Sequence, residues 1–335
     1  MAPVGALPAA VAVLARAADA GASVLLSAHV QPDADALGST LALAEGLRRR
    51  GARVTATFPG PFVLPASLAW LPGADALVPA GDVPADPDLV VGLDAADLRR
   101  LGELGPVLLA APQSLVVDHH ASNPGFGAVQ LVDPEAAATV ALVADLLDGL
   151  GVELDAGLAT LLYAGLAADT GSFRFGNTSP ATHALAARLL ATGIDHARIS
   201  QRLFDTAPFG WLALLGTAAG RATLERDVGA GLVWTWATVG EADDHGLAGD
   251  HLEALVDVVR SAQEADVACV LKGAADGSWN VSLRSRGGTD VSAVAIALGG
   301  GGHRMAAGFT SHLDRDGTLA AIRRCLRAGA APEQG

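Results

Sequence analysis

The residues of this sequence best suited to chemistry are histidines and aspartates that stand where apolar runs end. They are His29, Asp33, Asp35, Asp94, Asp118, His119, His120 and Asp169. Carboxylate oxygens with about one imidazole per ion suit Mn²⁺ or Mg²⁺, whereas zinc and copper favour more nitrogen or sulfur ligands. Because these aspartates would repel one another strongly if brought together, we expect two divalent ions among them. Two ions about 3.5 to 4 Å apart are the usual apparatus for displacement at phosphorus, with a water between them activated as the nucleophile.

Apolar strands alternating with helices must position these groups. The continuous apolar segments 23–28, 54–58, 88–94 and 114–118 are typical of parallel strands buried on both faces. Helical periodicity predicts helices over 7–20, 37–50, 135–150 and 180–193, while 161–168 fits either a helix or a strand. Open α/β sheets bind their ligands at the carboxyl ends of the strands, so we expect the charged groups to meet at one edge of the sheet.

The pattern changes beyond about residue 220. Segments 231–237, 266–271 and 279–284 read as strands, and Asp276-Gly277 is a hairpin signal between the last two. A helix near 249–262, a glycine run over 299–303 and a C-terminal helix accompany them. We therefore predict a metal-binding domain over 1–195, a helical linker over 196–220 and a smaller mixed-sheet α/β domain over 221–330.

The composition argues against several classes of protein. No apolar run approaches the roughly 20 residues of a membrane span, and the N-terminus lacks the basic flank of a signal peptide, so we expect a cytoplasmic protein without a membrane partner. The net charge of −14 argues against binding long duplex nucleic acid, because lysines and arginines supply most of that affinity. The two cysteines suggest neither a disulfide framework nor a thiolate metal site.

Taken in order, these groups resemble the four motifs of the DHH phosphoesterase superfamily. The motifs are His29-x3-Asp33-x-Asp35, Asp94, Asp118-His119-His120 and Asp169-Thr170-Gly171. The second half resembles the DHH-associated substrate-binding domain through 282–286 and the glycine run followed by 304–309. The two-domain layout is similar to that of the bifunctional oligoribonucleases (nanoRNases) that also act as 3'-phosphoadenosine 5'-phosphate phosphatases. The resemblance implies a parallel-sheet domain with helices on both faces, a smaller mixed-sheet domain and an active site in the cleft between them.

The same resemblance implies a role for each residue. One Mn²⁺ would be held by His29, Asp33 and Asp94, and the other by Asp35, Asp94, His119 and Asp169, so that Asp94 bridges the two. Asp118 would orient an imidazole, and His120 would face the substrate phosphate or stabilise the leaving oxygen. In the second domain, the implied phosphate contacts are Arg284, Gly301, Gly302 and His303. Glycines let backbone N–H groups approach an anion closely, which fits this assignment.

The implied activity is hydrolysis of oligoribonucleotides of two to five nucleotides, including pApA, and removal of the 3'-phosphate of adenosine 3',5'-bisphosphate. It would depend on two Mn²⁺ ions, with Mg²⁺ as the alternative, in a homodimer. Cyclic di-AMP is a further candidate substrate. The alternatives are a single-strand DNA exonuclease of the same superfamily, its manganese pyrophosphatase branch, which lacks the glycine–histidine run, and a non-catalytic sensor of nucleotides or cyclic dinucleotides.

Overall fold

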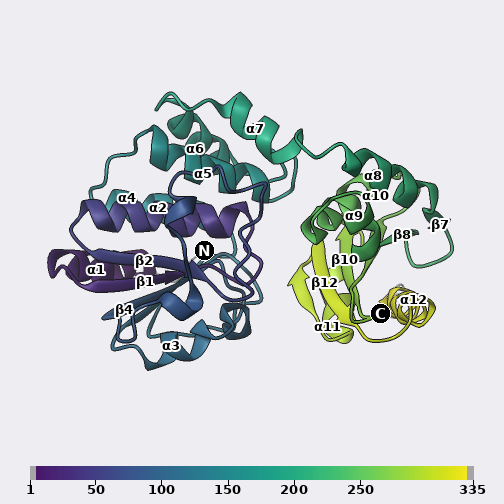
Figure 1. The fold of residues 1–335 in the computed structure, drawn as a ribbon, viewed down its shortest axis with the longest axis horizontal. Helices are drawn as coiled ribbons and strands as arrows, with labels where there is room; N and C mark the ends of the chain where they lie inside the picture. The colour runs from purple at the N-terminus through teal and green to yellow at the C-terminus, as the bar shows by residue number, and fades with distance from the viewer. Residues whose placement is uncertain (1–4, 330–335) are drawn as a thin grey trace, which may run out of the picture. The chain divides into compact units, whose positions relative to one another are not determined.

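The computed structural model describes residues 5–329, which form two compact units that divide between Thr206 and Ala207 (Figure 1). The predicted linker over 196–220 falls across this division. Helix α7 (His196–Phe204) belongs to the first unit, and helix α8 (Gly210–Gly220) belongs to the second. None of the described helices is long and apolar enough to cross a membrane.

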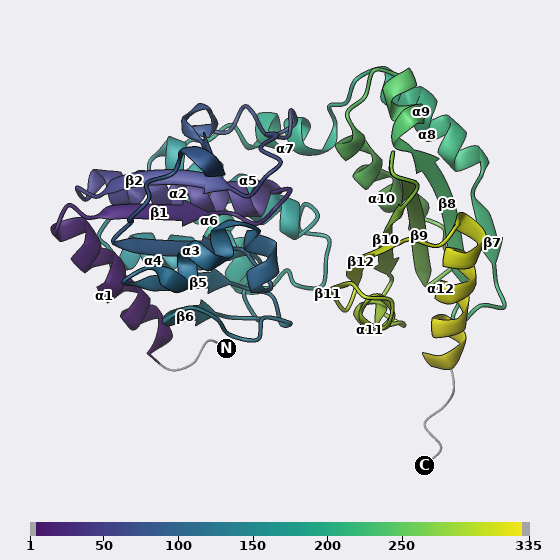
Figure 2. The same ribbon diagram turned by 60° about the horizontal axis from the view of Figure 1, so that its bottom comes forward.

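The first unit is built on a six-stranded sheet whose strands are all parallel; the sequence predicted a parallel sheet and four of its strands. Its strands are β1 (Ser23–Ser27), β2 (Arg53–Phe58), β3 (Val78–Pro79), β4 (Leu89–Leu93), β5 (Ser114–Asp118) and β6 (Val129–Val132). Their order is β3-β2-β1-β4-β5-β6, so the direction of winding reverses between β1 and β4. Figure 2 shows β6 at one edge with α1 beside it. The sequence prediction missed β3 and β6, because these short edge strands lack a continuous apolar run.

Helices cover both faces of this sheet, also as predicted (Figure 1). They are α1 (Ala6–Asp19), α2 (Ala34–Arg49), α3 (Leu104–Ala110), α4 (Thr139–Gly149), α5 (Ala156–Asp169), α6 (Pro180–Leu190) and α7. Alternate strand residues face opposite ways: Leu26 packs in the large core formed with α2, α4 and α5, whereas Leu25 packs in the smaller core formed with α3. The ambiguous segment 161–168 is helical, as part of α5.

Two glycines allow α2 and α5 to approach closely. A Cβ at Gly38 would lie 2.6 Å from the carbonyl oxygen of Leu161. A Cβ at Gly165 would lie 2.6 Å from Cγ1 of Val140 and 3.0 Å from Cα of Asp35. Since real side chains do not tolerate such distances, glycine at these positions fixes the separation of the two helices that carry Asp35 and Asp169.

The second unit has a mixed six-stranded sheet in the order β11-β12-β10-β9-β8-β7. Its strands are β7 (Thr223–Glu225), β8 (Leu232–Thr238), β9 (Val267–Gly273), β10 (Trp279–Ser285), β11 (Gly301–His303) and β12 (Ala306–Ser311). Only β8 and β9 pair in parallel, and the other pairs are antiparallel. Helices α8, α9 (Val239–Asp244) and α10 (Leu255–Val259) contribute to the core on one face, and α11 (Val291–Ala297) and α12 (Arg315–Gly329) to the core on the other. The predicted hairpin at Asp276-Gly277 joins β9 to β10, with Gly277 at a φ of 84°.

The glycine run needs a different interpretation from the one its composition suggested. Residues Gly301–His303 form strand β11 and pair with β12. A Cβ at Gly300 would lie 2.1 Å from the carbonyl oxygen of Gly308, and Gly302 has a φ of 136°. Close strand packing requires glycine at Gly300, and a left-handed backbone requires it at Gly302, whereas a Cβ at Gly301 would meet nothing within 4 Å. Binding of an anion by Gly301 and Gly302 stays a prediction.

Candidate metal centre

The crossover from β1 to α2 supplies three of the predicted residues. Asp33 is the N-cap of α2, and its Oδ1 accepts hydrogen bonds from the backbone N–H groups of Asp35 and Ala36, each at 3.0 Å. Its other oxygen, Oδ2, lies 3.9 Å from Nε2 of His29. Because Oδ1 of Asp33 accepts from the backbone N–H groups at the start of α2, Oδ2 remains oriented toward the imidazole of His29.

Asp94, at the end of β4, lies at the centre of the group. It is 2% exposed and has a φ of 57°, a left-handed conformation that is uncommon outside glycine. Its Oδ2 lies 3.6 Å from Nε2 of His29, and its Oδ1 lies 3.7 Å from Nε2 of His119. The two oxygens of one carboxylate therefore face histidines that follow two different strands.

The carboxylate of Asp35 accepts its two shortest hydrogen bonds from the start of α4, and a longer one, 3.4 Å, from the hydroxyl of Ser39 in its own helix. The backbone N–H groups of Thr139 and Val140 donate to its two oxygens at 2.6 and 2.8 Å. This carboxylate supplies the cap that α4 lacks, since the N-cap residue Ala138 has no side-chain acceptor. Asp35 is thus completely buried and still hydrogen-bonded.

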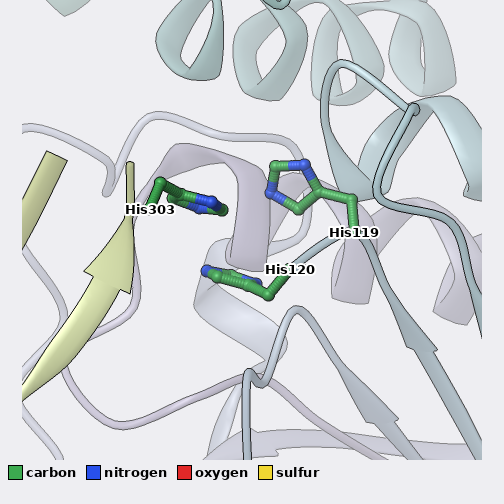
Figure 3. Close-up of side chains that lie close together, drawn as sticks. All are labelled: His119, His120 and His303. Carbon is green, nitrogen blue, oxygen red and sulfur yellow. The ribbon is translucent and has the colours of Figure 1, made fainter. Parts of the chain in front are cut away.

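His119 brings the remaining carboxylate into the group. Its Nε2 lies 3.1 Å from Oδ2 of Asp169 and 3.9 Å from Oδ2 of Asp35. Its Nδ1 lies 3.3 Å from the carbonyl oxygen of Ala136, which can accept the proton on that nitrogen and leave the Nε2 lone pair available as a ligand. Figure 3 shows His119 and His120 on the segment that follows β5.

The ligand atoms form groups of the size a metal ion needs. Three such groups lie within the first unit, and in each of them the atoms lie within 4.8 Å of one another: His29, Asp33 and Asp94; Asp35, Asp94 and His119; and Asp94, Asp118 and His120. Asp94 belongs to all three. The first two groups coincide with the two ligand sets that the motifs implied, apart from Asp169, which joins the second through His119. A donor set of carboxylates with single imidazoles fits Mn²⁺ or Mg²⁺.

The electrostatics of the centre favour a bound cation. Burial and repulsion from Asp94 raise the pKa of Asp35 well above its ordinary value. Burial and the charge of Asp33 likewise raise the pKa of Asp94. Burial opposes a charge on His119, yet hydrogen bonding to Asp169 and the charges of Asp94 and Asp35 raise its pKa to about 11. These carboxylates therefore retain protons or recruit positive charge to offset their mutual repulsion.

Asp118 orients His120 through a hydrogen bond. Its Oδ1 accepts from Nδ1 of His120 at 2.7 Å, and its Oδ2 accepts from the side-chain amide of Asn123 at 2.7 Å. Burial opposes a charge on His120, but the hydrogen bond to Asp118 and the charge of Asp94 raise its pKa. The pair therefore favours a protonated imidazole next to the metal-ligand groups.

In the second unit, strand register places the predicted phosphate contacts on one face. Ala306 of β12 lies opposite both Arg284 of β10 and His303 of β11, so the three side chains form one row across the sheet. His303, drawn in Figure 3, and Arg284 are both half-buried, and the small side chain of Ala306 lies between them in the row. Gly301 and Gly302 precede His303 on the same strand.

Four residues that contact the centre escaped the sequence analysis. The Thr139 hydroxyl donates to Oδ1 of Asp94 at 2.8 Å, Asn123 holds Asp118, and Arg100 contacts His29. The Asn177 amide donates to the carbonyl oxygens of Ala137 and Asp169, which ties the end of α5 to the segment before α4. Of these four residues, only Thr139 has a sequence signal, because it stands at the start of an apolar helix.

Comparison with known proteins agrees with this architecture. Residues 23–166 match the DHH family, N-terminal domain, and residues 233–328 match the DHHA1 domain. The bifunctional oligoribonuclease and PAP phosphatase NrnA of Thermus thermophilus is 34% identical over 308 residues, covering 91% of this chain and 89% of that protein. The cyclic-di-AMP phosphodiesterase GdpP of Geobacillus thermodenitrificans is 31% identical over 215 residues, covering 59% of this chain and 29% of that protein.

A solved structure extends the likeness to the whole fold. The exopolyphosphatase-related protein of Bacteroides fragilis has a TM-score of 0.87 and 23% identity, covering 98% of this chain and 97% of that one. The family matches, the identity over nearly the full length and the clustering of the four motifs agree with one another. The chain belongs to the DHH phosphoesterase family, in the group of bifunctional oligoribonucleases and PAP phosphatases, and is a hydrolytic enzyme.

Proposed function

We propose that this protein is a Mn²⁺-dependent phosphoesterase that hydrolyses oligoribonucleotides of two to five nucleotides, including pApA, and removes the 3'-phosphate of adenosine 3',5'-bisphosphate. The observation that carries the proposal is the pair of ligand groups that share Asp94. The Thermus relative, whose name gives both activities, supports the same assignment.

The proposed mechanism assigns the chain's residues to holding ions, moving a proton and binding phosphate. His29, Asp33 and Asp94 would hold one ion, and Asp35, Asp94, His119 and Asp169 the other. When bound, two such ions neutralise the carboxylates, polarise the phosphoryl oxygens and activate water for attack on phosphorus.

The proton for the leaving oxygen would come from His120. Asp118 accepts from Nδ1, which leaves the Nε2–H of the imidazolium as the acid. Arg284 and His303, which share one face of the second sheet, would bind a substrate phosphate.

Short substrates are favoured by the charge of the chain. With 22 basic against 36 acidic residues, the protein carries a net negative charge, which opposes binding of a long phosphate backbone. The few phosphates of a dinucleotide or a bisphosphate can instead be neutralised locally, by the ions and by single arginines. This argument disfavours the single-strand DNA exonuclease alternative.

A side-by-side hydrolysis assay tests the proposal. Purified protein with Mn²⁺ is incubated with pApA, adenosine 3',5'-bisphosphate or a long single-stranded DNA, and products are separated by chromatography. We expect adenosine 5'-phosphate from the first two and little product from the third. Asp94→Asn should abolish turnover, whereas Asp97→Asn, which removes the same charge three residues along the loop, should retain it. Absence of turnover, or full activity of Asp94→Asn, contradicts the proposal. Replacing Mn²⁺ with Mg²⁺ tests the choice of ion.

Cyclic di-AMP is a second candidate substrate, favoured by the likeness to GdpP over the region that the two proteins share. Adding it to the same assay ranks it against the linear substrates. Calorimetry that detects tight nucleotide binding without hydrolysis would instead support the sensor alternative. The homodimer and the cytoplasmic location stay predictions, and light scattering of the purified protein tests the first.

A further inference from the structure

Arg100 lies beside the metal-ligand groups without belonging to them. It sits in the helical turn Leu98–Leu101 that follows Asp94. Its carbonyl oxygen accepts a hydrogen bond from the backbone N–H of Val30 at 2.8 Å, which holds this turn against the β1–α2 crossover. Its Nη2 lies 2.9 Å from Nδ1 of His29, and the side chain is half-buried. The guanidinium is therefore held near the centre by both backbone and side chain.

The Nδ1 atom of His29 cannot satisfy both of its neighbours. It lies 2.8 Å from the carbonyl oxygen of Val30, which needs a donor, and 2.9 Å from Nη2 of Arg100, which needs an acceptor. The Nε2 atom of the same ring faces Asp33 and Asp94. If the Nε2 lone pair serves as a ligand, the neutral ring carries its proton on Nδ1 and donates it to Val30. Arg100 then faces an N–H group and loses its acceptor.

Among the described residues, no carboxylate lies within ion-pairing distance of Arg100 to replace that acceptor. Between residues 5 and 329 Arg100 forms no ion pair, whereas its neighbour Arg99 pairs with Asp97 at 2.9 Å. A half-buried guanidinium without an acceptor is costly, and its planar set of N–H donors matches the oxygens of a phosphate group. An anionic ligand that enters when His29 is a metal ligand would satisfy it.

We propose that Arg100 binds a phosphate oxygen of the substrate, and that metal loading frees it to do so by fixing the His29 tautomer. The inference rests on the proposed function, because it takes the substrate to be a phosphate ester of a nucleoside. It adds a phosphate contact from the same unit as the metal centre, beside Nδ1 of His29, whereas Nε2 of that ring faces Asp33 and Asp94. Metal would therefore bind first, and nucleotide affinity would depend on it.

Calorimetry with adenosine 5'-phosphate, which has no phosphodiester bond to cleave, tests this directly. The proteins compared are wild type, Arg100→Gln and the matched control Arg99→Gln, which removes the same charge from an exposed neighbour. In the presence of Mn²⁺ we expect Arg100→Gln to weaken binding by about 10-fold or more, and Arg99→Gln by less than about 2-fold. Arg100→Lys, which keeps the charge but not the planar fork, should fall between wild type and Arg100→Gln. Without Mn²⁺, the difference between wild type and Arg100→Gln should shrink.

Two further measurements separate substrate binding from an effect exerted through His29. The KM for pApA should rise by about 10-fold in Arg100→Gln while its Mn²⁺ affinity stays within about 3-fold of wild type. Equal nucleotide affinity in Arg100→Gln and Arg99→Gln overturns the inference, and so does a Mn²⁺ affinity that falls as far as the nucleotide affinity. If wild type hydrolyses neither pApA nor adenosine 3',5'-bisphosphate, the proposed function fails, and the comparison of nucleotide binding still decides the role of Arg100.

Discussion

Replacing Thr139 with valine removes the hydroxyl that orients the central carboxylate and leaves the rest of the site in place. Thr139 is completely buried, and its Oγ1 donates to Oδ1 of Asp94 at 2.8 Å. Its backbone N–H, which valine keeps, donates to Asp35. Thr139→Val therefore leaves Asp35 in place while one oxygen of Asp94 loses a donor. That oxygen is the one that faces His119.

The magnitude follows from the geometry. A buried hydrogen bond to a charged acceptor contributes about 1.5 to 3 kcal/mol, which corresponds to roughly 10- to 100-fold in an equilibrium constant. Outer partners of metal ligands have effects of similar size on metal affinity. We expect the Mn²⁺ dissociation constant of Thr139→Val, measured by calorimetry, to rise within this range. The kcat/KM for pApA should fall in parallel, because Asp94 belongs to both ligand groups.

Thr40 provides a matched control from the same unit. It is also completely buried, but its Oγ1 has no hydrogen-bond partner among the described residues. Thr40→Val should therefore leave Mn²⁺ affinity unchanged, and removing an unsatisfied hydroxyl should leave the free energy of unfolding equal or raise it by up to about 1 kcal/mol. Equal Mn²⁺ affinities in Thr139→Val and Thr40→Val would refute the role assigned to the Thr139 hydroxyl.

Three other predictions concern protons and packing. Because the pKa of His119 is raised to about 11 without metal, the ring holds a proton at neutral pH that Mn²⁺ must displace. The affinity for Mn²⁺ should therefore rise with pH, and calorimetry in buffers of different ionisation enthalpy should detect the release of this proton. Asp118→Asn removes an interaction that raises the pKa of His120, so the alkaline limb of the kcat profile should move to lower pH, while an unmoved limb would argue against His120 as the acid. Gly165→Ala should lower the free energy of unfolding, measured in urea, by about 1 to 3 kcal/mol, because the added Cβ would clash with Val140 and Asp35. Gly216→Ala, where the added Cβ would lie in open space on α8, should raise it by up to about 1 kcal/mol. Similar effects of the two substitutions would contradict the argument that Gly165 allows a close helix approach.

The sequence predicted the parallel sheet and the candidate metal ligands for the same physical reason. Buried strands read as continuous apolar runs, and a charged residue that ends such a run is conspicuous. Asp94 and His119 are found in this way without any knowledge of the fold. The edge strand β6 was missed because it is short and mostly half-exposed.

The residues that support the ligands could not be found in this way. Thr139 and Asp94 are separated by 45 positions, and Arg100 and His29 by 71. Their hydrogen bonds exist only once the crossover loops meet, and no local pattern distinguishes these side chains from ordinary surface or capping residues. The glycine run shows the converse, since a motif that resembles an anion-binding loop also leads into a strand, and the neighbours of Gly300 and Gly302 leave no room for a Cβ.

The bridging role proposed for Asp94 is a consequence of strand order. Strand β4 pairs with β1 on one side and with β5 on the other, so only a carboxylate at its end can face both His29 after β1 and His119 after β5. The left-handed φ of 57° at Asp94 occurs at this point, and such a conformation costs on the order of 1 kcal/mol or more outside glycine. The order of the strands therefore determines which aspartate lies between the two histidines and belongs to both of their ligand groups.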